Sequence, residues 1–340
     1  MRLLAALVLL AAALAGQRVK VTETAGLARS NEPVTLTIDG KERTLFVSIG
    51  ANQTRTVPLN PKAPAAIRFE QSGRAGFLLD NGIFAADHSP RVNNGKSEDS
   101  GTLRKLTHHA TGAVLLRTEN RMHWAPSFQR VGAKGYTSIA TWDPVQKSEV
   151  MRAPGVIAVR REGFHALYPE IGLKTEYRFF AGVPYFLFHA ATDIRQTIDM
   201  FWMRAQEMTM DDLFTHVAWP GRLVDFETRK AILEKDPLPV DLPWIAFLNM
   251  EKGYGFGAVI LDYKATTTAN ARTMVNDGAR NGKYWDRYLV GRVETRLNPG
   301  DRYEERTAYV LFRVSKDQPL KEFQYWQQRL HQPLRVELLR

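Results

Sequence analysis

The sequence predicts an all-β protein, built as a large antiparallel β-sandwich with a small N-terminal β unit and one C-terminal helix. Segments that alternate apolar and polar residues recur along the chain, as they do in half-buried strands. Helical spacing is confined to residues 319–331, near the C-terminus. The chain of 340 residues has no cysteine, so its stability must come from a large core and not from disulfides.

The N-terminus has the pattern of a secretory signal peptide. Arg2 precedes an apolar run, and Ala13-Leu14-Ala15 matches the small-x-small pattern of a cleavage site. We therefore expect residues 1–15 to be removed before Gly16 and the mature protein to be periplasmic or secreted. An uncleaved anchor is the alternative, although the run is short for a membrane span.

Residues 16–64 are predicted to form the small β unit. Asp39-Gly40 separates two strand-like runs and is a hairpin signal. Three prolines then form a stiff connector to the next unit. The strand-like runs of this region and its border are residues 18–22, 34–38, 44–48 and 66–70.

Residues 65–340 are predicted to form the large sandwich. Its strands are longer, and such strands without disulfides favour two stacked antiparallel sheets. The expected strands are residues 112–124, 156–161, 175–180, 185–192, 255–261, 284–293 and 307–313. The single helix follows from Leu320, Phe323, Trp326 and Leu330, which recur on one side of a helical turn.

The formal net charge of +10 predicts an anionic partner. The basic residues do not form the blocks typical of nucleic-acid-binding arms, so we expect no nucleic acid. For an exported protein an acidic polysaccharide fits better, because uronates offer carboxylates to arginine and ring faces to aromatic side chains. Solubility alone is the other explanation. The sequence has no phosphate loop or dinucleotide fingerprint, and we expect no cofactor.

Two stretches resemble known carbohydrate-active families. The run TEYRFFAGVPYFLFHAATDI (175–194) resembles a strand–turn–strand unit of the galactose-mutarotase-like supersandwich, found in aldose 1-epimerases and in β domains of polysaccharide lyases. The opening TAGLARSNEPVTLTI (24–38) resembles the start of secreted rhamnogalacturonan exo-lyase-like proteins. The resemblance implies a β-supersandwich fold and a carbohydrate ligand. It identifies no site residue, so candidates come from side-chain chemistry.

The stretch NRMHWAPSFQR (120–130) is the first candidate site. In one continuous strand, Arg117, Glu119, Arg121 and His123 would line a wet face and Trp124 the opposite face. Arginine can bind a carboxylate, and histidine titrates near neutral pH. A solvated strand face is the alternative interpretation.

Three other segments supply candidates. Tyr168 lies in a turn-rich segment, where a neighbouring arginine would favour its phenolate. Glu207, His216 and Trp219 are close in sequence, and His216 near Trp219-Pro220 resembles His123-Trp124 near Pro126. Asp211 and Asp212 match no named calcium loop, so no metal is predicted.

The segment 276–291 alternates two sets of side chains. Lys283, Trp285 and Arg287 would share one face, and Tyr284, Asp286 and Tyr288 the other. Trp285 and Arg287 are candidate sugar contacts. A strand edge with extended basic side chains is the alternative.

These observations predict an exported polysaccharide lyase acting on an acidic glycan by β-elimination. Arg121 would neutralise the substrate carboxylate, and His123, His216 and Tyr168 would transfer protons. The expected substrate contacts are Trp124, Arg117, Glu207, Trp219, Trp285 and Arg287. An aldose 1-epimerase-like isomerase and a non-catalytic glycan-binding sandwich remain the alternatives.

Overall fold

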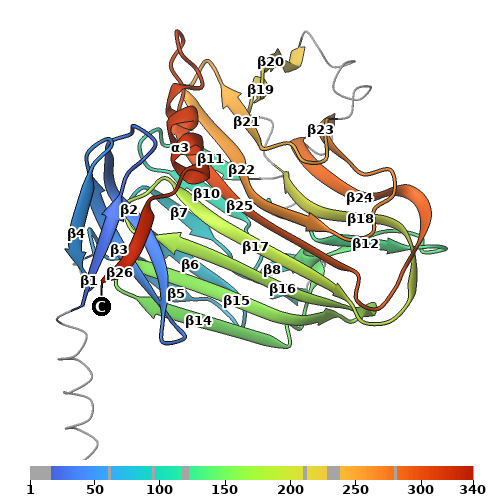
Figure 1. The fold of residues 1–340 in the computed structure, drawn as a ribbon. Helices are drawn as coiled ribbons and strands as arrows, with labels where there is room; N and C mark the ends of the chain where they lie inside the picture. The colour runs from blue at the N-terminus through green and yellow to red at the C-terminus, as the bar shows by residue number, and fades with distance from the viewer. Residues whose placement is uncertain are drawn as a thin grey trace, which may run out of the picture.

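The computed structural model describes residues 17–59, 63–93, 96–116, 122–209, 213–227, 238–278 and 282–339. Antiparallel sheets dominate, and one α-helix lies near the C-terminus of the described chain, so the predicted all-β sandwich is confirmed (Figure 1). The helix is α3 (Lys321–His331), and a 3₁₀ turn, η1, spans Ile139–Thr141. Among the described residues no helix is both long and apolar enough to cross a bilayer.

The largest layer is a nine-stranded antiparallel sheet. Its long central strands lie where the sequence predicts strands. In each of them successive side chains point to opposite faces of the sheet, and both faces are partly buried. In spatial order its strands are β14 (Lys147–Ala153), β15 (Val156–His165), β16 (Tyr168–Phe180), β17 (Tyr185–Ile194), β25 (Arg302–Arg313), β22 (Tyr254–Ala265), β21 (Trp244–Asn249), β19 (His216–Trp219) and β20 (Arg222–Asp225).

Two five-stranded sheets form the opposing layer. The first consists, in spatial order, of β11 (Val114–Leu116), β10 (Lys105–His108), β7 (Phe84–Asp87), β6 (Phe77–Asp80) and β5 (Arg68–Gln71). The second consists of β13 (Thr137–Ser138), β12 (Ser127–Arg130), β18 (Ile198–Thr209), β24 (Gly282–Leu297) and β23 (Arg272–Gly278). A two-stranded ribbon pairs β8 (Arg91–Asn93) with β9 (Lys96–Glu98).

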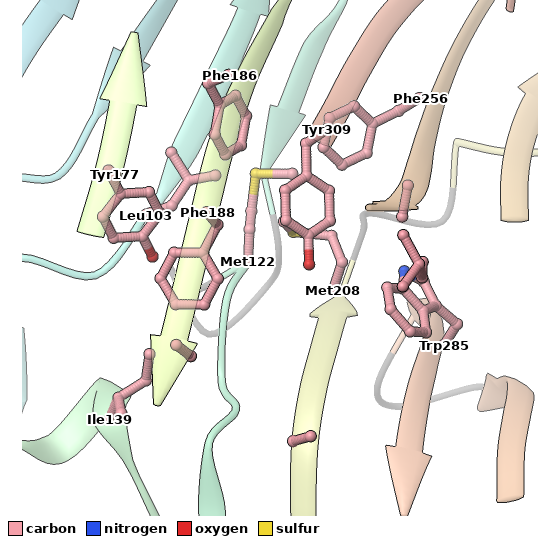
Figure 2. Close-up of a cluster of buried hydrophobic side chains, with 14 of the residues drawn as sticks. Leu103, Met122, Ile139, Tyr177, Phe186, Phe188, Met208, Phe256, Trp285 and Tyr309 are labelled. Carbon is pink, nitrogen blue, oxygen red and sulfur yellow. The ribbon is translucent and has the colours of Figure 1, made fainter. Parts of the chain in front are cut away.

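The main core fills the space between the nine-stranded sheet and the two smaller sheets. Tyr177, Phe188 and Tyr309 project from the large sheet, and Met208 and Trp285 meet them from β18 and β24 (Figure 2). On the other face of the large sheet, α3 covers a second apolar cluster through the fully buried Phe323. The alternation along β25 serves both cores, since Tyr309 and Leu311 belong to the first, and Ala308, Val310 and Phe312 to the second.

The predicted N-terminal unit contains β1 (Arg18–Thr22), the hairpin of β2 (Arg29–Ile38) and β3 (Lys41–Ile49), and β4 (Thr54–Pro58). Asp39 and Gly40 both have positive φ, as a tight hairpin turn requires. The chain returns here at its end: β26 (Arg335–Leu339) pairs with β1 in a three-stranded sheet (Figure 1). Arg29 of β2 and Arg329 of α3 both pair with Glu32, which ties the unit to the sandwich.

A buried ion pair joins the two layers of the sandwich. Arg287 of β24 donates from Nη1 to Glu305 Oε1 of β25 at 2.5 Å, and both side chains are almost completely buried. Arg287 also donates from Nη2 to the Leu242 carbonyl at 3.2 Å. Because both groups are shielded from water, each relies on the other to stabilise its charge.

We predict that Arg287→Ala lowers the free energy of unfolding by about 3–5 kcal/mol, because it leaves the buried Glu305 without its counter-charge. Urea denaturation at neutral pH measures the change. Arg296→Ala is the matched control, since Arg296 pairs with Asp199 on the exposed surface and its loss costs about 0–1 kcal/mol. Equal, small losses in both variants would contradict the prediction.

Candidate functional site

His123 does not lie on a wet face. Its side chain is fully buried in the core between the sheets, where its ring contacts Phe188. The Tyr177 hydroxyl donates to Nδ1 at 2.8 Å, and Nε2 donates to Gln206 Oε1 at 2.9 Å. Burial lowers the pKa of His123 to about 3, against a weaker opposing effect of the Gln206 hydrogen bond. The imidazole is therefore neutral and holds the core together in this structure.

Tyr168 and His216 do not come together. Tyr168 on β16 is buried, and its hydroxyl accepts from the Arg130 backbone N–H at 3.1 Å. His216 on β19 is half-buried and bonds to Thr215 Oγ1 at 2.8 Å. The two strands are five positions apart in the sheet order, which corresponds to about 24 Å. Arg121 lies outside the described residues, and the predicted catalytic set is not assembled among the other three.

Three of the six expected substrate contacts, Trp219, Trp285 and Arg287, lie in or against the core. Trp285 lies in the core (Figure 2), and Arg287 is buried in its ion pair with Glu305, so the face of β24 that they share is not a ligand surface in this structure. Trp219 ends β19 and packs partly against the main core. Arg117 lies outside the described residues. The two sets of side chains alternate along β24 as predicted, but Trp285 and Arg287 lie on its inner face.

Glu207 is the predicted residue around which the structure assembles a polar cluster. It lies on β18 and forms an ion pair with Arg204 of the same strand, at 2.8 Å. Residues three apart in a regular strand point to opposite faces. Here the pairing of β18 with β24 passes from Arg204–Tyr288 to Gln206–Arg287 and leaves Ala205 as the extra residue of a β-bulge. The bulge brings Arg204 and Glu207 onto one face.

Gln206 holds the bulge from the inside. It is fully buried, and its Oε1 accepts from His123 Nε2 and from the Tyr309 hydroxyl, both at 2.9 Å. Its inward position leaves Arg204 and Glu207 on the outer face of the sheet, away from the core. His123 thus affects the outer cluster indirectly: it bonds to Gln206, which positions the part of β18 that carries Arg204 and Glu207.

Asp286 of β24 completes the cluster. It pairs with Glu207 in the strand register, and its Oδ2 accepts from Arg204 Nη1 at 3.2 Å. Arg204 Nε donates to Ser127 Oγ of β12 at 2.9 Å. One buried guanidinium thus holds two buried carboxylates; we call Arg204, Glu207 and Asp286 the carboxylate triad.

Burial and neighbouring charges perturb the triad electrostatically. Burial raises the pKa of Asp286 to about 7, and the nearby Glu207 acts in the same direction while Arg204 opposes it. Burial disfavours the charge on Arg204, but the two carboxylates outweigh it and raise the Arg204 pKa. A carboxyl group that titrates near neutral pH can serve as an acid or as a base.

Aromatic rings frame the triad on the same face. Trp202 and Tyr288 stack with centroids 5.7 Å apart, and the half-exposed Tyr136 meets Trp202 edge to face at 5.0 Å. The Arg204 guanidinium lies 4.5 Å from the Trp202 ring and 5.0 Å from the Tyr136 ring. Trp124 also lies beside this part of β18. It follows His123, which pairs with Met208, and precedes Ser127, which pairs with Arg204.

Two further arginines lie at the border of the triad. The Arg272 guanidinium lies 5.3 Å from the Tyr288 ring, and that of Arg292 lies 5.8 Å from the Trp202 ring. Neither forms an ion pair with the described residues, and Arg292 is exposed. The face therefore combines two carboxylates, aromatic rings and three guanidinium groups, that of Arg204 included. Among the described residues, no group of three or more histidine, aspartate or glutamate side chains could hold a metal ion.

Arg204, Trp202 and Tyr136 were not among the sequence-derived candidates. A spacing of three residues in a regular strand predicts that Arg204 and Glu207 point to opposite faces, and the alternation pattern does not reveal the bulge that brings them together. Asp286 and Tyr288 were visible as one face of an alternating strand, but the choice between the two faces needed the core.

The His123 environment leads to a prediction about stability. Between about pH 3 and pH 6.5 the unfolded chain binds a proton at this residue and the folded chain does not, so the free energy of unfolding rises with pH. This residue contributes a slope of up to about 1.4 kcal/mol per pH unit, which vanishes above pH 6.5.

We expect His123→Gln to remove this component, so that the stability gap between wild type and variant narrows as the pH falls from 6.5 to 4. Denaturant titrations across this range measure it. Titrations above pH 7 are the internal control, since they report only the lost hydrogen bonds and packing. A gap that is constant over the whole range would show that His123 titrates normally.

No protein-family model matches the chain, and no curated protein sequence matches it. Solved structures do. An α-mannosidase from Enterococcus faecalis V583 is 10% identical, with a TM-score of 0.57, over 95% of this chain and 46% of the other. A glycosyl hydrolase family 38 protein from Enterococcus faecalis is 10% identical, with a TM-score of 0.54, over 95% and 47%.

A galactose mutarotase-like protein from Lactobacillus casei ATCC 334 is also similar, at 8% identity and a TM-score of 0.40, over 70% of this chain and 100% of the other. The chain spans about half the length of the first structures that it matches. At such identities the two structures from Enterococcus faecalis show a shared fold and nothing more.

Proposed function

We propose that the protein is carbohydrate-active and binds a sugar on the outer face of β12, β18, β24 and β23. The observation that carries this proposal is the carboxylate triad, in which Arg204 binds Glu207 and Asp286 beside the Trp202 and Tyr288 rings. Sugar rings stack on aromatic faces, and sugar hydroxyls bond to carboxylates and guanidinium groups. The similar fold of an α-mannosidase agrees with this class of ligand.

The triad also supports acid–base chemistry on the bound sugar. With a pKa of about 7, Asp286 is partly protonated at neutral pH, and Glu207 lies next to it. A carboxyl group that is partly protonated and lies beside a second carboxyl group can donate or accept a proton in a reaction. This arrangement suits an enzyme better than a non-catalytic glycan-binding sandwich, which needs the rings alone.

The finer proposal is a polysaccharide lyase acting on uronates. The net charge of +10 and the guanidinium groups of Arg272 and Arg292, which form no ion pair with the described residues, favour an anionic substrate. An arginine that binds the uronate carboxylate makes the adjacent C–H more acidic. A triad carboxylate would remove this proton, the electron pair would form a C=C bond, and the β C–O bond would break as its oxygen takes a proton.

Export belongs to the same proposal. The signal-like residues 1–15 would direct the chain to the periplasm or the medium, where acidic polysaccharides are found. The sugar isomerase alternative rests on the same carboxyl pair, which could transfer protons at an anomeric centre. The assays below separate these activities.

Trp202→Ala should weaken about tenfold the binding of a glycan that the wild-type protein binds, since the loss of an aromatic contact costs about 1–1.5 kcal/mol. Calorimetry against a panel of neutral and uronate oligosaccharides measures the affinity. Trp219→Ala is the matched control and should leave it unchanged, because Trp219 lies on β19 of the other sheet. The reverse pattern would place the sugar near β19 and contradict the triad site.

Asp286→Asn should lower the rate on the responsive uronate polysaccharide at least about a hundredfold and remove the rate dependence on pH near 7. The ultraviolet absorbance of the unsaturated elimination product, followed from pH 5 to 9, measures both. Arg296→Ala, at an exposed pair of β24, should keep the wild-type profile. An unchanged profile in Asp286→Asn would contradict the role of this carboxyl group.

A flat absorbance trace on every uronate polysaccharide would overturn elimination itself. Polarimetry on reducing sugars then tests the isomerase alternative. Glycan binding without either activity would leave a binding sandwich as the function.

A further inference from the structure

A second charged cleft lies on the outer face of the nine-stranded sheet, the face away from the main core. Its volume is about 400 Å³. Thr35 and Glu42 of the β2–β3 hairpin form one wall, and side chains of β15, β16, β17 and β25 form the floor. The cleft and the carboxylate triad belong to opposite layers of the sandwich, so a ligand in one does not depend on the other.

The floor is a cross-strand row of ionisable residues. Arg160 pairs with Glu176, Glu176 with His189, and His189 with Arg306 in the registers of four neighbouring strands. Directly paired side chains on one face of a sheet are close enough to interact. The row therefore alternates cation, anion, imidazole and cation across the cleft.

One end of the row is electrically compensated. Arg160 lies 2.5 Å from Glu176 and 3.0 Å from Glu42, and Arg178 lies 2.8 Å from Glu176 and 2.9 Å from Glu42. Two guanidinium groups and two carboxylates thus form a closed ring. Because Glu42 belongs to the hairpin, this ring also fastens the hairpin to the sheet.

The other end is compensated less directly. The imidazole of His189 is occupied by Glu304, with Nε2 at 2.8 Å from Oε1. Arg306 lines the cleft and is exposed; its register partner on β22 is Asp262, which pairs with Lys264 at 3.1 Å, and the described part of the chain shows no ion pair or side-chain hydrogen bond of the Arg306 guanidinium. Among the residues that line the cleft, three arginines face two carboxylates, so the lining is net positive beside a closed ring that positions its walls.

We propose that this cleft is a second binding site, for a small polyhydroxylated compound that carries a single oxyanion, with a sugar carboxylate as the best-fitting class. Arg306 would bind the oxyanion through its planar pair of N–H donors. The Thr35 hydroxyl and the Glu42 carboxylate lie across the cleft and could bond to ligand hydroxyls. A volume of about 400 Å³ is within the range of small-molecule sites.

Calorimetry of the full chain with glucuronate at low salt tests the proposal, with glucose and inorganic sulfate as comparison ligands. We expect glucuronate to bind, glucose to bind much more weakly, and Arg306→Gln to weaken glucuronate binding about tenfold or more. Arg296→Gln, an exposed arginine of β24 outside the cleft, should leave the affinity unchanged.

Trp202→Ala distinguishes this cleft from the carboxylate triad. Glucuronate binding that persists in Trp202→Ala and falls in Arg306→Gln supports the cleft. Binding that falls only in Trp202→Ala assigns glucuronate to the triad and overturns the cleft, as does an Arg306→Gln variant with wild-type affinity. Sulfate that binds as well as glucuronate, with the same dependence on Arg306, would support a general oxyanion site and overturn the preference for sugar acids.

Discussion

The structure depends on burying the inner face of the nine-stranded sheet without any disulfide. Alternate side chains of β16, β17 and β25 meet the two smaller sheets in one continuous core. Polar side chains of the described residues cross this core in connected pairs: His123 with Tyr177 and Gln206, and Arg287 with Glu305. Because an unpaired polar group there would be costly, these contacts also decide how the layers are aligned.

The same constraint shapes the outer cluster. Gln206 must point inward to meet His123 and Tyr309, and the bulge at Ala205 places Arg204 and Glu207 together outside. Contacts of Gln206 inside the core thus fix the positions of Arg204 and Glu207 on the outer face of the same strand. A β-bulge beside a polar cluster is a common way to direct side chains at a site. Asp286 then needs only its ordinary register on β24 to complete the triad.

The two candidate sites differ in how their charges are arranged. In the triad, two buried carboxylates share one guanidinium; burial and the nearby Glu207 raise the pKa of Asp286 to about 7, although Arg204 opposes the shift. In the cleft under the β2–β3 hairpin, partly exposed charges form a closed ring and leave Arg306 for a ligand. The first arrangement suits chemistry and the second suits binding, on opposite layers of one sandwich.

The fold class could be predicted from the sequence, because period-two alternation, the Asp39-Gly40 turn and the helical spacing of residues 319–331 are local properties. The sequence also offered Glu207 as a candidate, and its alternation separated Trp285 and Arg287 from Asp286 and Tyr288. Only the tertiary structure decided which face was the core, and this put His123, Trp285 and Arg287 inside. It also placed Tyr168 and His216 on strands five positions apart in one sheet, since sheet order is set by long-range pairing that alternation does not encode.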